Sequence, residues 1–231
     1  MDKESLMLTI GVIGGTGKEG KGLAYRWAKA GYRVLIGSRF EEKAVTAASE
    51  IMQLLEGSSS VVGTTNLEAA EQSDIVVLTV PYAAHKTTLE SVKDALRGKL
   101  LIDTTVPIMP PKVTKVQMPP AGSAAQEAKE ILGEDVQITA AFQNISHKLL
   151  MGEEFIECDV LVTGTGKDAR HEALKLVEAA GLTGWDAGPI ENSVVVEGLA
   201  NVLININKQY GSTHAGIKIT GANQSSTAKD R

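Results

Sequence analysis

The chain of 231 residues has a single cysteine, Cys158. It therefore cannot form an intrachain disulfide, and it lacks the cysteine clusters that bind zinc or iron–sulfur groups, which excludes a disulfide-stabilised secreted scaffold. No apolar run approaches the ~20 residues that a membrane-spanning helix needs. The short apolar run near the N-terminus leads into a glycine-rich turn rather than a cleavage site, so it is interpreted as a strand and not as a signal peptide. We expect a cytoplasmic protein without membrane contact.

Basic charge and aromatic rings are also scarce. Aromatic residues make up 4% of the chain, and the formal net charge is -5. Proteins that bind nucleic acid usually combine a basic surface with rings that stack on bases. We therefore predict small-molecule partners and no nucleic-acid partner.

The residue patterns of common catalytic sites are missing as well. The four histidines are scattered without the spacing of metal ligands, so no metal site is predicted. There is no serine-elbow motif, no Walker lysine and no paired-carboxylate signature. No catalytic side chain is assigned, although Tyr82, His85 and His147 are candidates for a proton donor. Hydride transfer suits such a chain because the cofactor carries the reactivity.

Glycine, by contrast, is abundant, with 23 residues. A predicted strand at residues 7–13 is followed by a glycine-rich segment at 14–22, in which Gly15, Gly17 and Gly20 fit the G-x-G-x-x-G spacing. Glycine at these positions allows a tight turn, close approach of the backbone to a pyrophosphate, and close packing of helix on strand. Because a strand precedes the motif and a helix follows it, a dinucleotide site is favoured over a merely structural turn.

The residues after the second predicted strand indicate the choice of dinucleotide. Where an NAD-binding protein would place an acidic residue, this chain has Ser38 and Arg39, with Lys43 one helical turn further on. A hydroxyl and two cations can bind a 2′-phosphate, which a carboxylate would repel. The pattern therefore predicts NADP(H), unless the two cations are surface charges that pair with the neighbouring glutamates.

Strands and helices alternate through the first half. Strands are predicted at residues 33–37, 61–65, 74–80 and 99–103, and helices at 23–30, 67–72 and 82 to about 97. Uninterrupted apolar strands in this alternation predict an α/β, Rossmann-type, doubly wound parallel sheet. Ligands bind at the carboxyl ends of such strands, so the nicotinamide is expected across residues 79–82 and 104–107.

Five of the seven prolines lie between Pro107 and Pro120. Proline removes backbone donors, so this segment is predicted to be a loop. It is either a wall or lid near the cofactor, or a plain linker.

The second half is expected to form a smaller C-terminal α/β domain. Its elements are predicted at residues 123–132, 136–142, 158–163, 168–180, 182–185 and 190–210. We predict an NADP-binding Rossmann domain at residues 1–145 and a domain at 146–231 that completes the substrate cleft. On the long helix, Glu197, Asn201 and Asn205 share one face. They either line the cleft or form hydrogen bonds between helices or subunits, and the apolar residues of this helix suggest a homodimer.

Several of these segments resemble one known family over residues 7–221. The segments are Ile13–Ala24, Ile36–Arg39, Leu78–Pro81, Asp186–Pro189, Leu203–Tyr210 and Gly216–Gly221. They look like those of NADPH-dependent coenzyme F420 reductases, also called F420H2:NADP oxidoreductases. The resemblance implies reversible hydride transfer between NADP(H) and the deazaflavin coenzyme F420 as co-substrate.

The resemblance also implies which residues bind the cofactors. Thr16, Ser38, Arg39 and Lys43 match positions that bind NADP, and residues 79–81 and 106–107 match the nicotinamide wall. The full expected set is Gly14, Gly15, Thr16, Gly17, Lys18, Glu19, Gly20, Ser38, Arg39, Lys43, Thr79, Val80, Pro81, Val106, Pro107, Ala140 and Phe142. Two alternatives stay open from the residues: an NADPH-dependent reductase of a small imine, carbonyl or flavin, or an NADPH-binding sensor without turnover.

Overall fold

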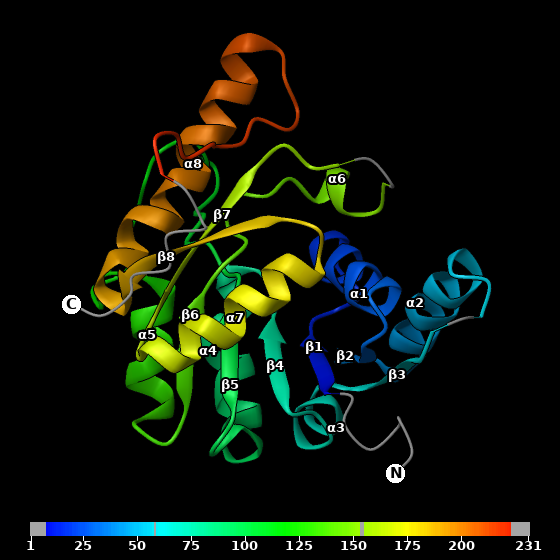
Figure 1. Cartoon of the computed structure of the whole chain (residues 1–231). Coiled ribbons are helices and arrows are strands. Elements are labelled where there is room, and N and C mark those ends of the chain that lie inside the picture. Colours follow the sequence, from blue (N-terminus) through cyan, green and yellow to red (C-terminus); the bar gives the residue numbers. More distant parts are fainter. Residues whose placement is uncertain (1–7, 58, 153–154, 223–231) are drawn as a thin grey trace.

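The computed structural model describes residues 8–57, 59–152 and 155–222. Eight strands of the described chain form one sheet in the order β3-β2-β1-β4-β5-β6-β7-β8 (Figure 1). The strands are β1 (Thr9–Ile13), β2 (Arg33–Ser38), β3 (Val61–Thr65), β4 (Ile75–Leu78), β5 (Leu100–Asp103), β6 (Gln137–Ala140), β7 (Asp159–Gly164) and β8 (Thr183–Pro189). Neighbouring strands are parallel except β6 and β7, which pair antiparallel.

Helices connect the strands and cover both faces of the sheet. They are α1 (Lys18–Lys29), α2 (Glu41–Leu54), α3 (Asn66–Glu71), α4 (Tyr82–Val92), α5 (Ala124–Leu132), α6 (His147–Leu150), α7 (Lys167–Ala179) and α8 (Ser193–Tyr210), with 3-10 helices η2 (Lys93–Leu96) and η3 (Ile190–Asn192). One hydrophobic cluster holds residues of α1, α2 and α7, and a second holds residues of α3, α4 and α5. The sheet is therefore doubly wound, as predicted.

The sequence accounts for most of these elements directly. The four residues of β4 are all buried, as expected of an apolar strand in a parallel sheet covered on both faces. Ser123 caps α5, because its side chain accepts a hydrogen bond from the backbone N–H of Gln126 at 3.1 Å. The predicted strand at residues 7–13 begins at Thr9, and Met7 lies outside the described residues. Helix α4 ends at Val92, earlier than predicted, and continues as η2.

The proline-rich segment at residues 107–120 forms no helix or strand, as predicted. It packs against α8. The side-chain amide of Asn201 donates to the carbonyl of Val113 at 2.8 Å, and a Cβ on Gly198 would lie 3.2 Å from Met118 Cε. These contacts hold the loop against helix α8.

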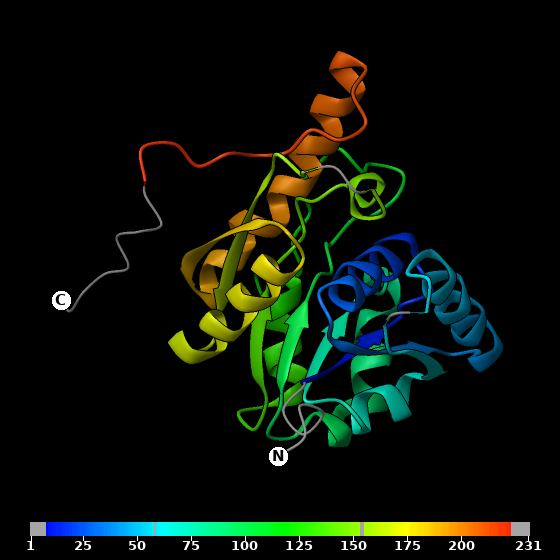
Figure 2. The ribbon, with the colours of Figure 1, turned by 45° about the vertical axis from the view of Figure 1, so that its right-hand side comes forward.

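The second half of the chain continues the sheet of the first half. Strand β7 pairs with β6 across the predicted boundary at residue 145, and β8 extends the sheet further. Helix α8 runs beyond the sheet, and both views show its C-terminal end projecting from the body (Figures 1 and 2). The division into domains 1–145 and 146–231 stays a prediction.

Candidate active site

The glycine-rich turn joins β1 to α1, and three of its glycines differ in backbone conformation or in the space around them. Gly14 has a φ of +72°, a conformation that favours glycine. A Cβ on Gly20 would lie 2.4 Å from Thr79 Oγ1 and 2.8 Å from Gly15 Cα, so helix and strand approach closely there. The nearest atom to a Cβ on Gly17 is Gly14 O at 3.5 Å. The space beside exposed Gly17 is thus open, while its own N–H donates to Gly14 O at 3.1 Å within the turn.

A pocket of about 740 Å³ opens beside this turn, at the carboxyl ends of β1, β4 and β5. Seven residues of the expected set line it: Gly17, Lys18, Glu19, Thr79, Val80, Pro81 and Val106. Ile108 and Pro110 contribute a wall from the proline-rich segment, and Leu203 and Asn207 contribute one from α8. The segment is therefore a pocket wall rather than a plain linker, and both halves of the chain build the pocket.

Gly14, Gly15, Gly20 and Pro107, four other residues of the expected set, do not line this pocket. Gly15 donates its backbone N–H to Gly37 O at 3.0 Å, which ties the turn to β2. Gly15, Gly20 and Pro107 are buried and Gly14 is half-buried. None of the four lines this pocket or the smaller one between α1 and α2.

The structure separates two further expected residues from the pocket. Ala140 and Phe142 are fully buried, and the Phe142 ring packs edge-on against Trp27 with 5.8 Å between ring centroids. Their side chains therefore contribute to the core, and a role in cofactor binding stays a prediction. The next two residues, Gln143 and Asn144, line the pocket instead.

Buried hydrogen bonds hold these two amide side chains in place. Gln143 Nε2 donates to Asp103 O at 2.8 Å, and Asn144 Nδ2 donates to Asp159 O at 2.6 Å. The opposite atoms, Gln143 Oε1 and Asn144 Oδ1, are buried without a hydrogen-bond partner among the described residues. Burying an acceptor atom without a hydrogen-bond donor lowers the stability of the fold unless a water or a ligand supplies that donor.

A second pocket, of about 500 Å³, lies between α1 and α2. Thr16 and Lys43 line it, together with Lys21, which forms an ion pair with Glu50. Arg39 is exposed at its strand end, and neither Arg39 nor Lys43 forms an ion pair with a described residue. The alternative that these two cations are neutralised by neighbouring glutamates is not seen here.

Ser38 is buried at the end of β2. Its hydroxyl accepts a hydrogen bond from the backbone N–H of Phe40 at 3.2 Å, and Lys43 Nζ lies 4.9 Å from the centre of the Phe40 ring. Phe40 thus contacts both the Ser38 hydroxyl and Lys43, and a 2′-phosphate site at Ser38, Arg39 and Lys43 stays a prediction.

Glu19 and His147 are two of the residues of the large pocket whose pKa values are shifted. Burial raises the pKa of Glu19 to about 8. Burial lowers the pKa of His147, and the charges of Lys18 and Lys148 lower it further. Around neutral pH these two side chains are therefore more often uncharged than their ordinary pKa values imply.

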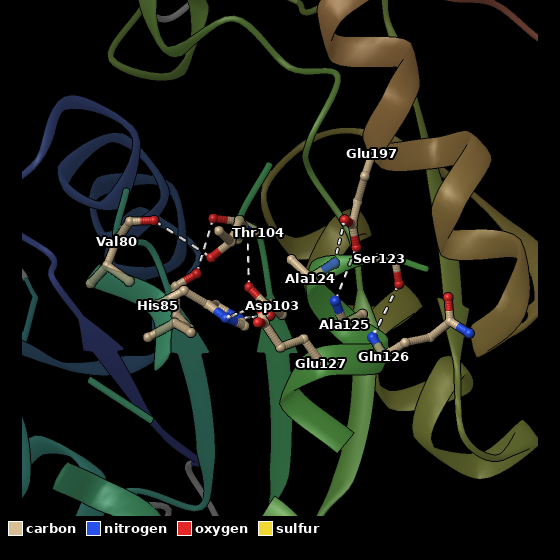
Figure 3. A network of polar contacts seen from close by, with 12 residues as sticks. Val80, His85, Asp103, Thr104, Ser123, Ala124, Ala125, Gln126, Glu127 and Glu197 are labelled. Carbon is tan, nitrogen blue, oxygen red and sulfur yellow. Dashed lines mark hydrogen bonds and ion pairs between the residues drawn. The ribbon is translucent and has the colours of Figure 1, made fainter. Parts of the chain in front are cut away.

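A buried polar network includes His85, Asp103, Glu127 and Glu197 (Figure 3). His85 is fully buried on α4, and its Nε2 lies 2.7 Å from Oδ2 of Asp103 at the end of β5. Its Nδ1 lies 3.4 Å from Oε2 of Glu127 on α5. Burial lowers the pKa of His85, but Asp103, Glu127 and Glu197 raise it, and the net direction is upward. His85 does not line the pocket, whereas Tyr82 and His147 do.

Glu197 closes this network from α8. Its carboxylate is fully buried and accepts from the backbone N–H groups of Ala124 at 2.7 Å and Ala125 at 3.1 Å, the first residues of α5. Burial raises the pKa of Glu197 to about 8. Asn201 bonds the proline-rich segment and Asn205 is exposed, so the polar face of α8 serves contacts between elements of the chain.

Sequence reasoning missed Gln143, Asn144, Asp103 and Glu127. Asp103 and the two amides follow strand ends, which is a signal that could have found them. Glu127 carries no such signal, because its position depends on how α5 packs. Among the described residues, no cluster of His, Cys, Asp and Glu could hold a metal ion, and no helix is long and apolar enough to cross a membrane.

Comparison with known proteins finds consistent relatives. The model of the family described as NADP oxidoreductase coenzyme F420-dependent matches residues 9–107. The F420-dependent NADP reductase of Methanothermobacter thermautotrophicus is 41% identical over 222 residues, 93% of this chain and 96% of that protein. The enzyme of the same name from Methanothermobacter marburgensis is 40% identical over 220 residues, 92% of this chain and 98% of that protein.

A solved structure extends the likeness to the fold. A protein from Arthrobacter sp. FB24, whose name refers to an F420-dependent NADP reductase, has a TM-score of 0.76 with this chain. The two are 24% identical, and the match covers 93% of this chain and 99% of the other.

Proposed function

The chain belongs to the F420-dependent NADP reductases, and on this premise we propose that it catalyses reversible hydride transfer between NADP(H) and the deazaflavin coenzyme F420. The observation that carries the proposal is the pocket itself. It joins exposed Gly17 to the ends of β4 and β5 and holds no nucleophile paired with a base among its described lining residues. Such a site can align two rings, which is what hydride transfer requires.

We further propose that the nucleotide spans both pockets. The glycine-rich turn and the N-terminus of α1 hold the pyrophosphate, because free N–H groups and the helix dipole favour anions there. Thr16, Ser38, Arg39 and Lys43 hold the 2′-phosphate. Residues 79–81 and 106–107 form the wall against the nicotinamide.

In this arrangement the bound cofactor supplies the hydride, and the chain supplies position. Thr79 is fixed because its hydroxyl donates to Ile13 O at 2.9 Å, and Thr104 is fixed by a bond from its hydroxyl to Leu78 O at 3.0 Å. The wall beside the rings is therefore rigid, and the segment at residues 107–120 shields it from water. Residues 146–231 are proposed to close the cleft, since α6 and α8 both contribute to the pocket lining.

A direct assay tests the function. Mixing the protein with NADPH and oxidised coenzyme F420 should bleach the absorbance band of the oxidised deazaflavin at a rate proportional to enzyme. Running NADP⁺ with reduced F420 should restore the band. Tight NADPH binding without loss of the band would favour a sensor, and turnover with an imine, carbonyl or flavin alone would favour a different reductase.

We propose that the enzyme is a cytoplasmic homodimer. The single cysteine favours a reducing compartment. Val195, Val202, Ile206 and Tyr210 are exposed on one face of α8, 37–79% each, and a second copy would cover them. Light scattering on a size-exclusion column should give twice the mass of the chain, and a monomer mass at micromolar concentration would overturn the dimer.

A further inference from the structure

The reaction involves a proton as well as a hydride. When a neutral reduced deazaflavin gives a hydride to NADP⁺, its ring loses two electrons with the hydride and one proton from a ring nitrogen. The nicotinamide is reduced, the deazaflavin is oxidised, and one proton must leave the site. A closed pocket therefore needs a group that passes this proton to solvent.

Tyr82 is the pocket residue that touches a buried acid–base network. It begins α4, lines the pocket, and its ring stacks on the His85 ring with centroids 5.9 Å apart. The Glu127 carboxylate is close enough to the Tyr82 hydroxyl to raise its pKa. Tyr82 thus belongs to the pocket lining and also borders the buried network.

Glu127 connects this hydroxyl to the surface. Its side chain is 26% exposed, whereas those of His85 and Asp103 are 1% exposed. His85 Nδ1 lies 3.4 Å from Oε2 of this carboxylate, within ion-pair distance but without a hydrogen bond. Asp103 holds His85 at 2.7 Å, and its other oxygen accepts from the Thr105 backbone N–H at 2.9 Å. Asp103 therefore orients His85, and His85 lies beside Glu127 (Figure 3).

We propose that Tyr82 and Glu127 form a proton relay between the reaction pocket and solvent, which His85 and Asp103 hold in position. In the direction of NADP⁺ reduction, the Tyr82 oxygen accepts the ring proton while its own hydroxyl proton moves to the Glu127 carboxylate. Glu127 then releases that proton to water, so Tyr82 and Glu127 return to their starting states. The reverse reaction uses the same steps backwards. This proposal rests on the function proposed above.

The surrounding charges favour this direction of transfer. Burial, together with the nearby charges of Glu127 and Glu197, raises the pKa of Tyr82 to about 12, so the phenol stays protonated and its oxygen does not retain a negative charge. Glu197 faces the network from α8. Lys18 and Glu19 of α1 and His147 of α6 line the same pocket as Tyr82.

The test compares Tyr82→Phe and Glu127→Gln with the wild type. Glu130→Gln, an exposed position on the same helix, is the matched control. We expect kcat to fall about tenfold or more in both relay variants while KM for NADPH changes less than about twofold. The solvent isotope effect in D2O should rise, and the primary isotope effect of 4-deuterated NADPH should fall, because proton transfer becomes slower than hydride transfer. A merely structural defect would leave the balance of the two isotope effects unchanged.

A second readout needs no cofactor. In histidine NMR titrations, with His85→Gln to assign the signal, Glu127→Gln should lower the pKa of His85 by about half a unit or more. Glu130→Gln should leave it unchanged. An unchanged pKa of His85 in Glu127→Gln overturns the network, even if Tyr82→Phe does not fold.

The outcomes separate the relay from the function. If the wild type turns over F420, and Tyr82→Phe and Glu127→Gln show the same rates and isotope effects as the wild type, the relay is overturned and the proposed function is not. Absence of F420 turnover in the wild type overturns the proposed function and the relay with it. Equal losses in the Glu130→Gln control also overturn the relay, because the effect would then not depend on the contact with Tyr82.

Discussion

Replacing Glu197 by glutamine should change how the stability of the protein depends on pH. Burial raises the pKa of Glu197 from 4.5 to about 8. The folded chain therefore holds a proton that the unfolded chain releases between these values. A pKa difference of one between the folded and unfolded states is worth about 1.4 kcal/mol, so the difference for Glu197 corresponds to about 5 kcal/mol.

The sign follows from the proton count. Because the folded state binds more protons in this window, the free energy of unfolding falls as pH rises, by up to about 1.4 kcal/mol per pH unit. From pH 5.5 to 7.5 the wild type should lose about 2–3 kcal/mol relative to Glu197→Gln, whose side chain does not titrate. The upward shift of the His85 pKa acts in the same direction, and its part that comes from the Glu197 charge is lost in Glu197→Gln together with the titration of Glu197.

Urea unfolding followed by tryptophan fluorescence at several pH values measures this difference, since Trp27 is fully buried. Glu191→Gln, at an exposed position on η3, is the control and should track the wild type. Glu197→Ala should lose about 2–5 kcal/mol at every pH, because it leaves the N–H groups of Ala124 and Ala125 unpaired. A difference between wild type and Glu197→Gln that stays constant to within about 0.5 kcal/mol across the range would refute the reasoning.

Three further predictions concern the nucleotide and the subunit contact. Gly20→Ala should destabilise the fold by about 1–3 kcal/mol, because its Cβ would lie 2.4 Å from Thr79 Oγ1. Gly17→Ala should keep the melting temperature of the wild type and lose affinity for NADPH in a fluorescence titration. Arg39→Asp should weaken NADPH binding by about tenfold or more and NADH binding little, and equal losses would remove the argument for the 2′-phosphate. Val202→Glu should convert a dimer into monomers in light scattering without changing the circular dichroism spectrum.

Local patterns were sufficient for most of the architecture. Apolar runs that end at glycine or at a turn located β1 to β6 closely, and the boundaries of β3 coincide with the predicted residues 61–65. The central strands are buried on both faces, and their short, continuous apolar runs distinguish them from the longer helices. The pairing of β6 with β7 had no such signal. It is an antiparallel contact between segments about twenty residues apart, and it depends on tertiary packing rather than on local sequence.

The residues after β6 show why it is harder to predict which side chains at a strand end line the pocket. Phe142 follows β6 with a φ of +74°, a rare conformation for a bulky residue. This turn directs its ring into the core against Trp27 and leaves Gln143 and Asn144 facing the pocket. In a regular strand, alternation would have placed Phe142 and Asn144 on the same face. The positive φ of Phe142, for which the sequence carries no signal, therefore determines which side chains line the pocket.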